Sequence, residues 1–129
     1  MKKLFIVLLL VSAAAHADQG WRRVGESRPA DGTPAFNFDL KEGSCVRLVN
    51  ANGIHVMMCM ERIQNTRTNS STFDWIGVDQ KECQQGWGTL WTMDFNGVVL
   101  SQAQVASGGG TIGAGEWDFL CRLAAGIIT

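Results

Sequence analysis

Four cysteines are the most reactive side chains of this sequence. Cys45, Cys59, Cys83 and Cys121 are even in number, and an even count in an oxidising compartment is typical of disulfides rather than of thiolate nucleophiles. No Cys-x-x-Cys pair is present, so the spacing does not favour a zinc site. Four cysteines allow three pairings, and the hairpin described below favours Cys45 with Cys59, which leaves Cys83 with Cys121.

His55 is the only histidine after residue 17, so histidine-based catalysis or metal binding would have to use it. No Gly-x-Ser-x-Gly motif accompanies it. Carboxylates suited to a glycosidase pair are present as well, but spacing along the chain does not give their separation in space. They are Glu61, Asp74, Asp79, Glu82 and Glu116. We therefore predict no catalytic, cofactor-binding or metal-ligating residue, and keep a small secreted hydrolase as an alternative.

Residues 108–113 match the formal pattern G-x-G-x-x-G. A dinucleotide site needs this pattern between a strand and a helix. We instead expect a closing strand over 116–123, because apolar residues alternate there with polar ones. The side chains expected to point inward are Trp117, Phe119, Cys121 and Leu123. The glycines then indicate a flexible loop and no cofactor.

The stretch 43–62 positions two of the cysteines. Two apolar runs flank an Asn-Gly, which is typical of a β-hairpin. With a three-residue loop, Asn50 faces Ile54, and counting outward places Cys45 opposite Cys59, as a cross-strand disulfide requires. One face is expected to be core: Val46, Leu48, Ile54, Val56, Met58 and Met60. The other carries the cysteines with Arg47, Val49, His55, Met57 and Glu61.

Further strands are predicted over 36–40, 73–79, 89–95 and 98–102, the third of which leads through an Asn-Gly turn into the fourth. The strand over 73–79 is expected to be covered on both faces. In the second hairpin Phe95 faces Val98 and Trp91 faces Gln102. Residues 101–107 are either strand or short helix, and strand is favoured. Short strands without a convincing long helix predict an all-β fold, a small antiparallel β-sandwich or barrel stapled by two disulfides.

The N-terminus has the features of a secretory signal peptide. Lys2 and Lys3 precede an apolar run over 4–11 and an Ala-His-Ala ending at Ala17. The run is too short to span a bilayer, so we expect a mature chain without membrane insertion, in the periplasm or the medium of a bacterium. We predict three segments: a cleaved signal peptide over 1–17, a loosely ordered N-terminal arm over 18–34, and a single β-domain over 35–129.

Charge excludes one class of partner. Loss of Lys2 and Lys3 changes the formal net charge from −1 to −3, and the remaining basic residues are scattered. Nothing in this distribution favours nucleic acid.

Tryptophans and one polar stretch are the candidates for binding. Trp21 and Trp87 each follow Gln-Gly, which resembles the Q-x-W signature of ricin-type lectins, but two copies without a third do not make a three-lobed trefoil, and the chain is not assigned to that family. Nine polar residues over 64–72 predict an exposed loop. The predicted partner-binding residues are Trp21, Asn65, Arg67, Asn69 and Trp87. Trp91 and Trp117 are expected in the core.

These observations favour a secreted or periplasmic, non-enzymatic binding module. An inhibitor or immunity-type protein that engages another protein is one example. A carbohydrate-binding, lectin-like module is the first alternative, and the small hydrolase is the second.

Overall fold

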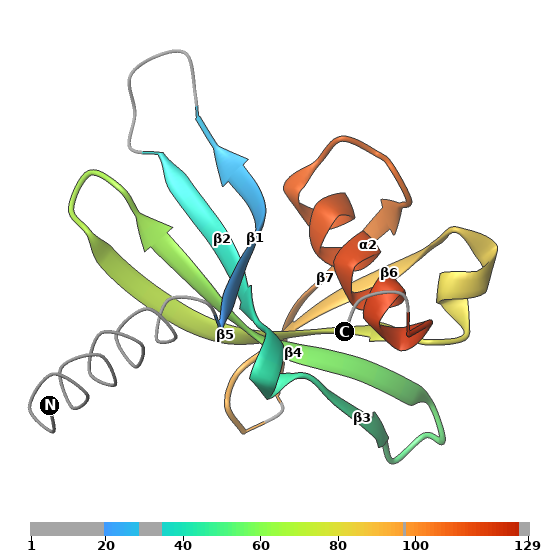
Figure 1. Ribbon diagram of the computed structural model, residues 1–129. Helices are drawn as coiled ribbons and strands as arrows, with labels where there is room; N and C mark the ends of the chain where they lie inside the picture. Colours follow the sequence, from blue (N-terminus) through green and yellow to red (C-terminus); the bar gives the residue numbers. More distant parts are fainter. Residues whose placement is uncertain (1–19, 29–34, 97, 127–129) are drawn as a thin grey trace, which may run out of the picture.

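The computed structural model describes residues 20–28, 35–96 and 98–126. The predicted signal peptide and cleavage site lie outside these residues. The elements, in chain order, are β1 (Trp21–Ser27), β2 (Phe36–Lys41), the 3₁₀ turn η1 (Glu42–Ser44), β3 (Val46–Val49), β4 (His55–Asn65), β5 (Ser70–Asp79), the 3₁₀ turn η2 (Glu82–Gln85), β6 (Trp87–Met93), β7 (Val99–Ala106) and α2 (Ile112–Ala124) (Figure 1).

The strands form one antiparallel sheet in the order β1-β2-β4-β5-β6-β7, with β3 paired to β4 beside this path. Among the described strands β1 and β7 do not pair with each other, so the sheet is not closed. The helix α2 packs against one face of the sheet, where Ile112 contacts Gly25 of β1. The described residues include no helix that meets the length and hydropathy needed to cross a membrane.

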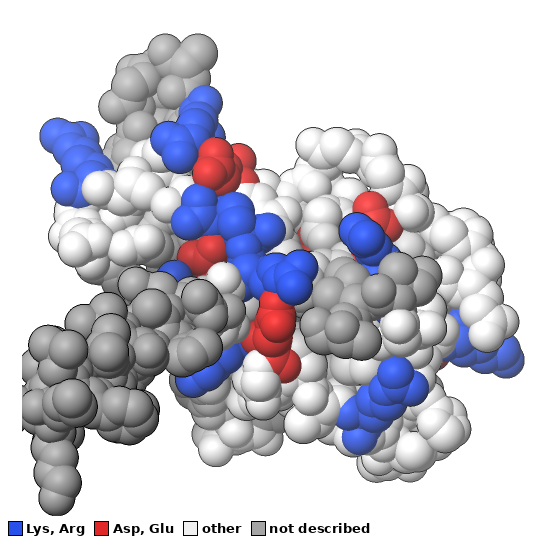
Figure 2. Space-filling view, viewed as in Figure 1, with Lys and Arg blue, Asp and Glu red and all other residues white. Residues whose placement is uncertain are grey.

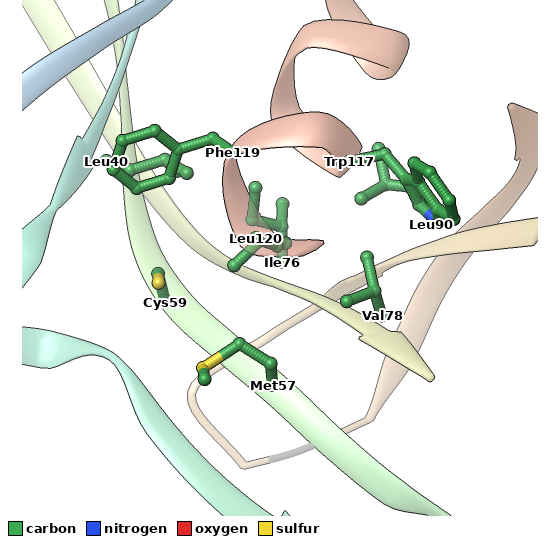
Figure 3. Packing of buried hydrophobic residues seen from close by; sticks show 9 residues of the cluster. All are labelled: Leu40, Met57, Cys59, Ile76, Val78, Leu90, Trp117, Phe119 and Leu120. Carbon is green, nitrogen blue, oxygen red and sulfur yellow. The ribbon is translucent and has the colours of Figure 1, made fainter. Parts of the chain in front are cut away.

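The core lies between α2 and the sheet (Figure 3). Trp117 and Leu120 of the helix are almost completely buried, as predicted for Trp117. The buried cluster is Leu40, Met57, Cys59, Ile76, Val78, Leu90, Trp117, Phe119 and Leu120. Because one helix covers one face only, β5 is not covered on both faces as predicted, and Phe73 is 46% exposed. Trp91, expected in the core, is half-buried.

The all-β prediction is wrong in one element, because residues 112–124 form a helix and not a closing strand. The Thr111 side chain accepts a hydrogen bond from the Ala114 N–H and so caps the helix. Trp117, Leu120 and Ala124 follow one another at helical spacing on one side of α2, and this period replaces the alternation. The fold is therefore a mostly antiparallel sheet with a single α-helix and two disulfides.

The first hairpin has the predicted register. Pairing from Val46 with Met58 to Val49 with His55 agrees with a loop centred on 51–53, and Cys45 and Cys59 are bonded with their Cα atoms 4.1 Å apart. The second disulfide, Cys83–Cys121, joins η2 to α2 and closes a separation of 38 residues. Both favoured pairings are confirmed.

The face assignment in this hairpin is wrong except at Val56, which is 4% exposed as expected. Met57 and Cys59, placed by sequence on the outer face, are 4% and 0% exposed under α2, whereas Val46 and Leu48 of the expected core face are 44% and 37% exposed. The reason is the second disulfide, since Cys121 holds the helix on the cysteine side of the hairpin.

The second hairpin keeps Trp91 opposite Gln102, and residues 99–106 are a strand as favoured. The predicted pair of Phe95 with Val98 does not extend the ladder, because β6 ends at Met93. Met93 pairs with Val99, and a bulge at Leu100 separates this pair from that of Thr92 with Ser101. The Asp94 carboxylate accepts hydrogen bonds from the backbone N–H groups of Asn96 and Val98 and shapes a wider turn. Phe95 is 62% exposed as a result.

Two polar segments form more strand than expected. The nine-residue loop over 64–72 shrinks to a turn over 66–69, since β4 runs to Asn65 and β5 begins at Ser70. Within the predicted N-terminal arm over 18–34, the structure describes strand β1, which pairs with β2 through a bulge between Arg23 and Gly25. Residues 18–19 and 29–34 lie outside the described residues.

Candidate functional site

The sheet face turned away from α2 carries a run of large apolar side chains. Residues paired across an antiparallel sheet share a face, and pairing places Met60, Trp75 and Met93 in one row. These positions alternate along each strand with the buried cluster, so they point to the other side. We call this surface the open face, and it comprises Trp21, Met58, Met60, Phe73, Trp75, Trp91 and Met93.

A glycine flattens the centre of the open face. A Cβ atom at Gly77 would lie 3.0 Å from the methyl carbon of Met93 and 3.3 Å from Val56, so the Met93 side chain lies across the strand at the place left free. Trp75 meets the edge of Phe95 with ring centroids 6.4 Å apart. Methionine and aromatic side chains that stay partly exposed are typical of adaptable protein-binding surfaces.

Cations border one end of the open face. The Arg62 guanidinium carbon lies 4.4 Å from the centroid of the Trp21 ring, and the Lys41 ammonium lies 5.8 Å from it. The Phe73 ring centroid lies 6.1 Å from the Trp21 ring centroid. Figure 2 shows basic and acidic side chains gathered in a band over β1 and β2. An aromatic platform beside fixed guanidinium groups suits a surface that combines apolar and acidic groups.

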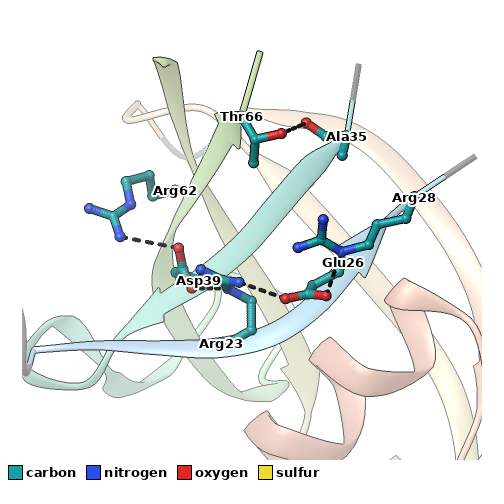
Figure 4. A network of polar contacts seen from close by, with 7 residues as sticks. All are labelled: Arg23, Glu26, Arg28, Ala35, Asp39, Arg62 and Thr66. Carbon is teal, nitrogen blue, oxygen red and sulfur yellow. Dashed lines mark hydrogen bonds and ion pairs between the residues drawn. The ribbon is translucent and has the colours of Figure 1, made fainter. Parts of the chain in front are cut away.

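The Asp39 carboxylate holds the arginines of this border in place (Figure 4). Its side chain is 3% exposed and accepts hydrogen bonds from Arg23 Nε at 2.6 Å and from Arg62 Nη2 at 3.1 Å. The hydrogen bond to Asp39 is the main cause that raises the pKa of Arg23. Because the two guanidinium groups are already fixed, binding a partner costs little additional side-chain entropy.

The structure does not gather the five predicted partner-binding residues. Trp21 belongs to the open face, whereas Asn65, Arg67 and Asn69 lie at the tip of the β4–β5 hairpin, about 15 Å further along the sheet. The Asn65 carboxamide oxygen accepts hydrogen bonds from backbone N–H groups within the turn. Asn69 has a positive φ of 59°, and its side-chain oxygen accepts a hydrogen bond from the Gln64 side chain. These two asparagines therefore shape the turn.

Trp87 lies at the beginning of β6, paired with Ala106 near the other end of the sheet. It is 56% exposed and follows Gly86, whose φ of 83° lets the chain turn out of η2. Its indole is thus presented to solvent apart from the Trp21 cluster.

A pocket of about 990 Å³ lies between α2, η2 and the beginning of β4. His55, Ser107 and Asp118 all line it, together with the Cys83–Cys121 disulfide. Among the described residues no hydrogen bond links these three side chains, and Asp118 accepts one from the Gly108 N–H instead. The pocket therefore holds the residue types of a hydrolytic triad without its connections.

Two carboxyl groups, those of Glu61 and Glu116, are buried between α2 and the sheet, and that of Asp74 is half-buried beside Glu61. Glu61 is 2% exposed and faces Asp74 across β4 and β5. Burial raises the pKa of Asp74 to about 6 and that of Glu116, on α2, to about 7. Within the described residues no group of three acidic, cysteine or histidine side chains is close enough to hold a metal ion.

The glycine-rich stretch 108–113 does lie between a strand and a helix, contrary to the sequence-based expectation. The helix follows an antiparallel strand, however, and the described strands form no parallel β-α-β unit. Gly108 and Gly110 take φ values of 69° and 77°. They serve the tight connection from β7 into α2.

Comparisons with protein-family models, with curated proteins and with solved structures found no match to this chain.

The open face is the feature that sequence reasoning missed. Its signal is present in the even-numbered apolar residues of β4, for which the sequence pattern predicts a place in the core.

Proposed function

We propose that this protein is a secreted or periplasmic, non-enzymatic module that binds another protein on the open face. The observation that carries the proposal is the open face itself: tryptophan, phenylalanine and methionine side chains spread over a disulfide-stapled sheet. Contiguous apolar surface of this composition is typical of protein interfaces, where tryptophan and arginine contribute most of the binding energy. An exported inhibitor or immunity-type protein fits these properties.

The chemistry of the partner follows from the border of the open face. Arg62 and Lys41 stand beside the apolar centre, so a complementary surface presents an apolar patch flanked by carboxylates. Arg62 covers the Trp21 ring, which leaves less of this indole for stacking on a sugar. The cation border therefore favours an acidic protein surface over a carbohydrate.

The test is capture of a partner from periplasmic extract, followed by measurement of its affinity with purified components. Trp75→Ser removes the central ring of the open face, and Gln84→Ala, on the opposite side in η2, is the matched control. We expect the partner to bind the natural chain and the control with equal Kd and to bind Trp75→Ser at least about tenfold more weakly, as for a hot-spot aromatic residue. Equal binding by all three chains, or no specific partner, refutes the proposal.

Carbohydrate binding is a second candidate, supported by the 56% exposed indole of Trp87. A planar exposed ring is the group on which a sugar ring stacks. Titration with oligosaccharides would then quench fluorescence of the natural chain and leave Trp87→Ala unaffected. Unchanged fluorescence across a glycan panel rejects this candidate. The hydrolase alternative is not advanced, because the pocket lining lacks a connected triad.

A further inference from the structure

The two ends of the sheet path are protected very differently. Strand β1 carries Arg22, Arg23 and Glu26 within seven residues, and charged side chains are the usual protection of an edge strand against pairing with another chain. Strand β7, at the other end, has the sequence VLSQAQVA, with neither charge nor proline. No charged residue occurs in the whole stretch between Asp94 and Glu116.

Strand β7 is also accessible along its length. Every residue from Val99 to Ala106 is exposed except Val105, which is half-buried. A bulge at Leu100 interrupts pairing with β6 near the beginning of the strand. The regular tract that remains, residues 101–106, is long enough to pair with a further strand.

The register of β7 against β6 determines which backbone groups of β7 point outward at the edge of the sheet. The Ser107 N–H bonds to the Gly86 carbonyl, and Gly88 pairs with Val105. In an antiparallel ladder, bonded and outward-facing residues alternate, so residues 101, 103 and 105 bond to β6. The N–H and C=O groups of Gln102 and Gln104 therefore face outward, and no backbone partner for them occurs among the described residues. The C=O of Ala106 accepts a hydrogen bond from the Gly109 N–H, so it is already satisfied.

We propose that this edge pairs with the β7 edge of a second copy of the chain, antiparallel and about a two-fold axis near Ala103. Self-pairing fits because two uncharged edges meet without repulsion, whereas nothing on β7 offers the charge that would select a different strand. An antiparallel pair brings Gln102 of each copy opposite Gln104 of the other, so it satisfies the outward backbone groups of these residues and places glutamine side chains along the junction. The open face and its aromatic residues stay available, so this interface is separate from the proposed function.

The test is the association state of the purified, disulfide-intact protein, measured by sedimentation equilibrium from about 1 to 100 µM, the range expected for a small interface. Ala103→Lys places like charges near the axis, and Ala103→Gln is the uncharged control. Gln102→Pro removes an outward N–H without removing a bond to β6. Circular dichroism verifies that each variant is folded.

We expect a monomer–dimer equilibrium for the natural chain and Ala103→Gln, and at least about tenfold weaker association for Ala103→Lys and Gln102→Pro. Amide exchange at Gln102 and Gln104 should slow as protein concentration rises. The open-face variant Trp75→Ser should dimerise normally. A natural chain that is monomeric throughout, or a dimer that both β7 variants leave intact, overturns the proposal.

Discussion

Arg62 lies over Trp21, with its guanidinium carbon 4.4 Å from the centroid of the indole ring. The two residues come from β4 and β1, which do not pair with each other. Strand β2 lies between them, and its Asp39 carboxylate forms an ion pair with Arg62. Three strands thus contribute one side chain each to the border of the open face. The stability of this arrangement depends on the buried carboxylate.

Asp39→Asn should destabilise the protein, because it removes the charge that two guanidinium groups share. We expect a loss of about 1–2 kcal/mol in the free energy of unfolding, less than for a fully buried pair since both arginines are partly exposed. Urea denaturation measures it. Glu26→Gln, which removes an exposed partner of Arg23, is the control and should leave the midpoint unchanged. Equal midpoints for the natural chain and Asp39→Asn would contradict the role assigned to Asp39.

Stability should fall as pH rises from about 5 to 8. Burial raises the pKa of Glu116 to about 7 and that of Asp74 to about 6, so the folded chain binds more protons than the unfolded chain in this interval. The free energy of unfolding is therefore highest below the unfolded-state pKa values and declines as pH passes through the folded-state values. The contribution of Glu116 is on the order of 2–3 kcal/mol, and that of the more exposed Asp74 is smaller.

Glu116→Gln isolates this effect, since glutamine has the same shape and no charge. The variant should be more stable than the natural chain at pH 8 and about as stable at pH 4. Urea denaturation at both values is the measurement. If the gain at pH 8 does not appear, the Glu116 carboxyl is not held in a desolvated position.

The two disulfides should differ in their contribution to stability. By loop closure, the bond across 38 residues contributes about 4 kcal/mol and the bond across 14 residues about 3 kcal/mol. The double variants Cys83→Ser with Cys121→Ser, and Cys45→Ser with Cys59→Ser, avoid free thiols. Denaturant midpoints should fall further for the first pair, which also releases α2 from η2. The reverse order would show that α2 docks without its tether.

Substitution by alanine should have different effects on stability at two glycines of α2. A Cβ atom at Gly115 would lie 2.6 Å from the Val24 carbonyl oxygen, whereas one at Gly113 meets only side-chain atoms, the nearest at 3.3 Å. Both substitutions gain about 1 kcal/mol of helix propensity, so their difference reports the clash. We expect Gly115→Ala to lose about 1–3 kcal/mol and Gly113→Ala to be neutral or stabilising. Thermal unfolding distinguishes them, and equal midpoints would contradict the contact with β1.

The sequence predicted local structure well where a turn determined it. The Asn-Gly of the first hairpin set the register, and the register brought Cys45 and Cys59 together. The local sequence did not determine which face of the hairpin is buried, because Met57 and Met58 are both apolar and lie on opposite faces. Only the long-range disulfide between Cys83 and Cys121 decides on which face α2 docks.

The helix was missed because its sequence fits two periods. Trp117, Phe119, Cys121 and Leu123 alternate as in a strand, while Leu120 breaks the alternation and completes a helical set with Trp117 and Ala124. For the candidate site, sequence reasoning identified Trp21 but not its neighbours Phe73 and Arg62, since only the strand order places β1, β2, β4 and β5 side by side.

The position of α2 at the end of the described chain has a consequence for biogenesis. Trp117, Phe119 and Leu120 supply a third of the buried cluster, and every described strand precedes them in the sequence. A nascent polypeptide emerges N-terminus first, so one apolar face of the described strands stays uncovered until α2 has been synthesised. Prematurely terminated translation products that lack this segment should be proteolysed rather than accumulate.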